Sequence, residues 1–137
     1  MVISDSFGGG CLCGAIRYVV RGKPKVVAFC HCSWCRRSAG APITAWAMFD
    51  ARNFQFEKGD PRKYASSPGV ARSFCSHCGT PLTYTADFLP GIVDVTVGSL
   101  DDPSALPPQM HIWDSRRIAW VQVSDGLPRH HELPPEP

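Results

Sequence analysis

The chain has 137 residues, the size of one ordinary domain, and its hydrophobic and charged fractions of 44% and 19% are those of a globular protein. Fourteen basic residues against twelve acidic ones give a formal charge of +2, and the basic residues form no long stripe, so the sequence disfavours a nucleic-acid partner. No apolar run approaches the roughly 20 residues that span a bilayer, and the N-terminus lacks a signal-peptide pattern, so we expect a cytoplasmic protein without membrane contact.

Short runs rich in β-branched and aromatic residues recur along the chain and predict an all-β fold. We expect strands at 15–20, 26–30, 43–49, 53–57, 82–85, 92–97 and 111–113, with the turn signals RGKP, EKGDP, SSPG and LPG among them. Only CSWCRRSA, residues 32–39, favours a short helix, so at most one or two helical turns are expected. The whole chain, 1–137, is expected to be one domain with its core at about 8–128, a flexible N-terminus and a flexible proline-rich tail, RHHELPPEP.

The seven cysteines form three groups whose spacings are typical of metal sites. They are the C-x-C of Cys11 and Cys13, the C-x-C-x-x-C of Cys30, Cys32 and Cys35, and the C-x-x-C of Cys75 and Cys78. In an extended segment residues i and i+2 share a face, so each C-x-C pair can bind one ion, whereas His31 then points away from it. The C-x-x-C is followed by Gly79, which has the backbone freedom that the tight turn of a zinc knuckle needs. An odd number of cysteines in a reducing compartment argues against a disulfide framework.

The simplest assignment places four of these cysteines around one Zn²⁺ and leaves three for a second. A closed site of Cys11, Cys13, Cys75 and Cys78 would be structural. The remaining Cys30, Cys32 and Cys35 would offer three ligands and an open position, which is the pattern of a catalytic zinc site. Three alternatives remain: a redox pair, an iron–sulfur cluster, and a second structural zinc completed by a histidine such as His77 or His111.

Five stretches of the sequence together resemble the glutathione-dependent formaldehyde-activating enzyme and centromere protein V family. They are GGCLCGAIRY (9–18), FCHCSWCRRSAG (29–40), FCSHCGTPL (74–82), VGSLDDP (97–103) and MHIWDSRRIAW (110–120). The resemblance implies a β-tent fold of antiparallel sheets around zinc, and the same division of the cysteines between two ions. The activity that it implies is the condensation of formaldehyde with glutathione to S-(hydroxymethyl)glutathione, which is classed as a carbon–sulfur lyase activity.

An open zinc site would turn a bound thiol into a thiolate, and that thiolate could attack an aldehyde. Because three thiolates leave Zn²⁺ with a net charge of −1, nearby cations should help, and Arg36 and Arg37 directly follow the third ligand. The candidate catalytic residues beyond the ligands are Arg36 and, as a proton carrier, His111. The alternative for Arg36 and Arg37 is a position on a solvated helix face. Three aromatic residues can wall a pocket or belong to the core (Trp34, Trp46 and Tyr64), and His130 and His131 are expected to be solvated. The rival function is a non-enzymatic, zinc-stabilised binding module or a sensor of thiols or aldehydes.

Overall fold

The computed structural model of the chain describes residues 5–134 and consists mainly of β-strands, which confirms the all-β expectation. The strands are β1 (Ser6–Gly10), β2 (Arg17–Arg21), β3 (Val26–Cys30), β4 (Thr44–Asp50), β5 (Phe54–Lys58), β6 (Arg62–Ser67), β7 (Val70–Phe74), β8 (Pro81–Ala86), β9 (Ile92–Thr96) and β10 (Met110–Ile112). The α-helix is α1 (Ser33–Ala39), and four 3-10 turns are η1 (Ala51–Asn53), η2 (Val97–Ser99), η3 (Pro103–Ala105) and η4 (Asp114–Arg116). No helix within residues 5–134 is long and apolar enough to cross a membrane.

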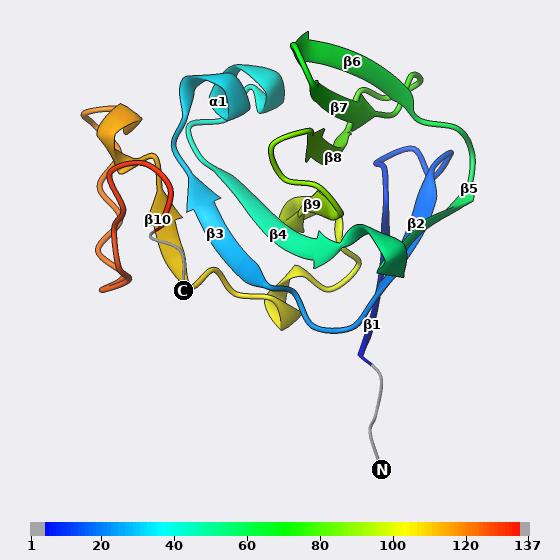
Figure 1. The fold of residues 1–137 in the computed structure, drawn as a ribbon, viewed down its shortest axis with the longest axis horizontal. Coiled ribbons are helices and arrows are strands. Elements are labelled where there is room, and N and C mark those ends of the chain that lie inside the picture. Colours follow the sequence, from blue (N-terminus) through cyan, green and yellow to red (C-terminus); the bar gives the residue numbers. More distant parts are fainter. Residues whose placement is uncertain (1–4, 135–137) are drawn as a thin grey trace.

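The strands form two sheets (Figure 1). The small sheet has the order β1-β2-β5, and the large sheet has the order β10-β3-β4-β9-β8-β7-β6. The pairs are antiparallel, as expected, except that β10 runs parallel to β3 at one edge of the large sheet. The strands β8 and β9 pair at Thr83–Val95 and Tyr84–Asp94, and residues 87–91 connect them.

The main core contains side chains from both sheets. Val27, Ala47 and Val95 lie opposite one another on β3, β4 and β9, and all three are nearly inaccessible. They belong to the same cluster as Tyr18 of β2, whose ring stacks on Phe54 of β5 at a centroid distance of 5.3 Å. One face of the large sheet therefore faces this core, because alternate residues of a strand share a face.

The opposite face of the large sheet carries a different set of side chains. Directly opposed residues form a continuous row from β3 to β6: Val26, Met48, Asp94, Tyr84, Arg72 and Tyr64. A second row contains Ala28 and Trp46, followed further along β3 by Cys30. This face, which we call the site face, therefore combines apolar side chains with a cysteine, an arginine and an aspartate.

Described residues of the two ends that we expected to be flexible form backbone hydrogen bonds with neighbouring strands. Residues 6–9 lie in β1. Gly9 is buried there, so close to the Tyr18 ring that a Cβ would collide with it. The tail runs beside β10: His130 donates its backbone N–H to His111, and Trp113 donates to Glu132. Figure 1 shows this C-terminal segment, orange to red, on the outer side of β10. The first four and last three residues of the predicted flexible ends lie outside the described residues.

Candidate metal centres

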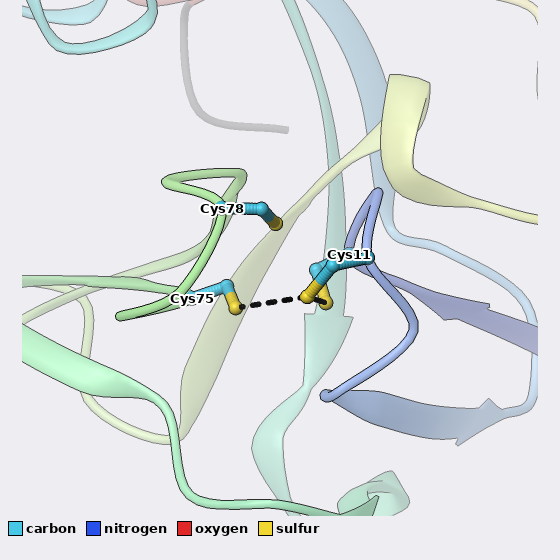
Figure 2. A group of neighbouring side chains, drawn as sticks. Cys11, Cys75 and Cys78 are labelled. Carbon is cyan, nitrogen blue, oxygen red and sulfur yellow. Dashed lines mark hydrogen bonds between the residues drawn. The ribbon is translucent and has the colours of Figure 1, made fainter.

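The first cysteine group, Cys11, Cys13, Cys75 and Cys78, comes from two turns more than sixty residues apart. Cys75 and Cys78 lie in the turn after β7, and Cys11 approaches them from the turn after β1 (Figure 2). Gly79, at φ 81°, donates its backbone N–H to the Cys75 carbonyl at 2.8 Å, which closes the predicted knuckle. Cys11 and Cys13 belong to a turn and not to the extended segment that we expected, yet their sulfurs are only 3.6 Å apart.

The geometry of this group fits a tetrahedral metal ion. All four sulfurs lie within 4.8 Å of one another, and the Cys13–Cys75 sulfur distance is 3.8 Å. Sulfurs at about 2.3 Å from a tetrahedral ion such as Zn²⁺ are separated by about 3.8 Å. A hydrogen bond from the Thr80 hydroxyl is the main cause that lowers the pKa of Cys78, to about 5, so one ligand is a thiolate at neutral pH. The group can hold a metal ion between the two sheets.

The second cysteine group, Cys30, Cys32 and Cys35, is built at the junction of β3 and α1. Cys30 ends the strand, and Cys32 is the N-cap of the helix, where its sulfur accepts the backbone N–H of Cys35 at 3.3 Å. The Cys30 and Cys35 sulfurs are 3.7 Å apart, and all three lie within 4.8 Å of one another. Among residues 5–134, no histidine or carboxylate joins these three ligands.

The three thiols of the second group influence one another strongly. Hydrogen bonds with Cys30 and then Cys35 lower the pKa of Cys32 to about 2. The hydrogen bond with the ionised Cys32 in turn raises the pKa of Cys30 far above its usual range. The three thiols therefore do not ionise independently, and a cation bound among them would favour the ionised form of each.

Arg72 is the cation next to this group, and the sequence analysis missed it. Its Nη1 and Nη2 each lie 3.8 Å from the Cys35 sulfur, and its Nε donates to Ser66 at 3.2 Å. The guanidinium lies over the Tyr84 ring at 4.9 Å, and only 9% of the residue is exposed. A buried cation held by three contacts can offset the negative charge of a thiolate cluster. The signal that could have revealed it is an arginine inside VARSF, directly before the C-x-x-C.

Two adjoining pockets open beside the second cysteine group. The inner pocket has a volume of about 650 Å³, and its walls include the three cysteines and Arg72. The outer pocket, of about 800 Å³, shares Trp34, Trp46 and Arg72 with the inner one. Tyr64 lines the outer pocket, so all three aromatic residues that we considered as pocket walls occupy such positions. Trp46 also belongs to a buried cluster with Cys30 and Cys35.

The arginines that we singled out differ in position. Arg37 lines the outer pocket, whereas Arg36 lines neither pocket. Neither side chain forms a hydrogen bond or an ion pair within the described part of the chain, and neither contacts a cysteine sulfur there. The described contacts thus give Arg72, and not Arg36, the place beside the cysteines.

His111 is fully buried but lies outside both pockets. In the parallel pairing of β10 with β3, Ile112 is opposite Cys30 and His111 is opposite Phe29, so His111 is on the other face of the sheet. Its Nδ1 is 2.8 Å from His31 Nε2, and its Nε2 is 2.8 Å from an Asp125 carboxylate oxygen. Burial is the main cause that lowers the pKa of His31. The two histidines therefore form a polar chain behind the second cysteine group and do not face it.

Comparison with known proteins places the chain in a family. The profile of the family described as glutathione-dependent formaldehyde-activating enzyme matches residues 6–116, which contain all seven cysteines. The chain belongs to this family. A Schizosaccharomyces pombe protein, named as an uncharacterized lyase, is 33% identical over 78 residues, covering 57% of this chain and 56% of that protein. The match therefore spans little more than half of the yeast protein.

A second similar sequence and a similar solved structure cover more of this formaldehyde-activating enzyme family member. A Halomonas elongata protein, provisionally named a glutathione-dependent formaldehyde-activating enzyme, is 29% identical over 125 residues, which are 84% of this chain and 79% of that protein. A crystal structure of a Rhodobacter sphaeroides protein superimposes with a TM-score of 0.52 at 21% identity, covering 90% of this chain and 98% of the other. At that identity the structural likeness establishes the fold alone.

Proposed function

We propose that this family member is a zinc-dependent carbon–sulfur lyase that joins and separates a small thiol, glutathione or a similar one, and formaldehyde or a similar aldehyde. The observation that supports the proposal most directly is the second cysteine group, because it supplies three ligands at the wall of a pocket and no fourth. Three protein ligands with one open position are typical of a catalytic zinc site. The names of the family and of its relatives point to the same class of reaction.

The two cysteine groups would have different roles, one structural and one catalytic. Cys11, Cys13, Cys75 and Cys78 would hold a structural zinc, because a closed set of four sulfurs leaves no position for a substrate. Cys30, Cys32 and Cys35 would hold the second, catalytic zinc. When bound there, Zn²⁺ would keep an incoming thiol ionised at neutral pH without any change of oxidation state.

The residues around the second group would bind and orient the reactants. Arg72 would offset the excess negative charge of several thiolates, because its guanidinium is already held beside Cys35. Trp34 and Trp46 would exclude water from the place where the carbon–sulfur bond forms. The cytoplasmic location that we expected from the sequence suits this chemistry, since a reducing environment keeps such thiols free.

The test is the exchange rate between formaldehyde and S-(hydroxymethyl)glutathione at equilibrium, measured by NMR with and without the zinc-loaded protein. Because the two reactants combine unaided, the spontaneous rate is subtracted. We expect a rate above this background in the wild type, and loss of that excess in Cys32→Ser, which removes one ligand of the second group. Saturable thiol binding with no rate above background would instead identify a sensor or a binding module.

A further inference from the structure

Among residues 5–134, the carboxyl group that lines the inner pocket is that of Asp94. Asp94 lies in the middle of β9, directly opposite Met48 on β4 and Tyr84 on β8. It lines the same pocket as the three cysteines of the second group. The alternation in IVDVTV predicts a half-buried strand, but it does not tell which face of that strand meets solvent.

Asp94 has no partner for its charge within the described residues. It forms no hydrogen bond or ion pair there, and its immediate neighbours on the site face are a thioether and a phenol ring. Burial raises the pKa of Asp94 to about 7. The carboxyl group therefore exchanges its proton with solvent in the neutral pH range, where a general acid or base is most effective.

The other titratable and charged groups of the inner pocket are not suited to exchange a proton in the neutral pH range. They are Cys30, Cys32 and Cys35, Arg72, Tyr84 and Arg116. A guanidinium group is a hydrogen-bond donor without an acceptor and is unsuited to act as a base. Burial raises the pKa of Tyr84 above its ordinary value, so the phenol holds its proton, and the cysteines are assigned to the metal. The histidines His31 and His111 lie behind the sheet and line neither pocket.

The proposed reaction needs a proton at an oxygen atom as well as a thiolate. When a thiolate attacks an aldehyde, the carbon–sulfur bond forms and the π electron pair of the carbonyl moves to its oxygen, which must then accept a proton. In the reverse direction the hydroxyl proton leaves, the carbonyl reforms, and the electron pair of the breaking carbon–sulfur bond returns to sulfur. The second cysteine group accounts for the sulfur but not for the oxygen.

We propose that Asp94 is the catalytic acid and base of this site, which donates its proton to the oxygen of the thiol–aldehyde adduct as the carbon–sulfur bond forms and removes it as the bond breaks. This inference rests on the proposed function. The proton balance closes without a further reactant, because the proton that the incoming thiol releases on ionisation restores the acid form of Asp94 through solvent.

The test combines infrared spectroscopy with kinetics on zinc-loaded protein. The carbonyl band of a neutral carboxyl group should titrate near pH 7 in the wild type and be missing in Asp94→Asn. The matched control is Asp60→Asn, which changes an exposed aspartate in the turn between β5 and β6 and should keep the band. Asparagine has nearly the same shape but cannot transfer a proton, so the rate of adduct exchange should fall about 100-fold or more. Glutathione binding, measured calorimetrically, should change less than about threefold.

Several outcomes would overturn the inference. If Asp94→Asn keeps the wild-type rate and pH profile, Asp94 is not the acid and base, whereas the proposed function stands. If the wild type itself shows no rate above background, the proposed function is wrong, and the inference about Asp94 falls with it. Asp94→Glu keeps a carboxyl group one methylene further from the backbone. It should therefore retain part of the exchange rate, and that rate should still depend on pH. An Asp94→Glu variant that folds and binds glutathione but shows no rate above background would therefore also count against proton transfer by this group.

Discussion

Replacement of Arg72 by methionine should weaken the second metal site and leave the first one intact. Methionine has a similar length and no charge, so the change removes the cation while filling most of its space. In the structure the guanidinium is nearly buried and holds two nitrogens 3.8 Å from the Cys35 sulfur. Arg72 does not touch the first cysteine group within the described residues, which gives the experiment an internal reference.

The distance sets the expected size of the effect. Two unit charges 3.8 Å apart attract one another by about 4 kcal/mol at an effective dielectric constant of about 20. The net contribution of hydrogen bonds to a charged group is smaller, about 1.5–3 kcal/mol, because the guanidinium loses water when it binds. The second metal ion should therefore bind roughly 10- to 100-fold more weakly in Arg72→Met. Arg72→Lys should lie between this variant and the wild type, because it keeps the charge and loses the two-pronged contact.

A competition titration with a chromophoric zinc chelator measures this change, because we expect two groups with four and three sulfur ligands to release their ions in separate steps. The matched control is Arg37→Met, which removes an exposed cation from the outer pocket and contacts no cysteine in the described residues. The reasoning is refuted if Arg72→Met and Arg37→Met release the second ion at the same chelator concentration as the wild type.

Three further predictions concern stability. Cys75→Ser should lose the first metal ion and melt at a clearly lower temperature in calorimetry, because its buried sulfur belongs to the group that joins the turn after β1 to the turn after β7; a variant that keeps its two ions and its melting temperature would contradict this. Gly9→Ala should reduce the free energy of unfolding by about 1–3 kcal/mol in urea because its Cβ meets the Tyr18 ring, whereas Gly98→Ala, in open space, should be nearly neutral. Since burial raises the pKa of Asp94 from 3.8 to about 7, the folded state holds this proton longer than the unfolded state, so its contribution to stability should fall as pH rises from about 4 to 7. The free energy of unfolding of the wild type minus that of Asp94→Asn, measured by urea titration, should decrease over this pH range. A difference that does not change with pH would show that the pKa of Asp94 is not raised by folding.

The cysteine spacings predicted the metal groups because spacing alone restricts which sulfurs can meet. The strands from 15 to 57 and the helix at 32–39 were also predicted, since their apolar residues repeat with a clear period. β1 could not be predicted, because its glycines have little strand preference and are placed by Tyr18. The hairpin of β6 and β7 was missed except for its SSPG turn, because these strands are polar and β6 is largely exposed at the edge of the sheet.

The residues on the site face depend on strand register, which the sequence does not show. Alternation separates the two faces of a strand, but it does not tell whether the polar face meets solvent or a pocket. The sequence therefore led to no prediction for Asp94 or Arg72, although opposed strands bring both into the wall of the inner pocket. His111 was a candidate for the site. The pairing of β10 with β3 instead places Ile112 opposite Cys30 and His111 opposite Phe29.

The visible spectrum of the cobalt-substituted protein, recorded with and without glutathione, tests the central claim most directly. Cobalt takes the tetrahedral place of zinc, and its thiolate charge-transfer bands report how many sulfurs are bound. We predict two bound ions, with a spectrum that shifts and saturates on addition of glutathione and no longer shifts in Cys32→Ser. A wild-type protein that binds both ions and keeps its spectrum unchanged with glutathione would contradict an open, thiol-binding position at the second cysteine group.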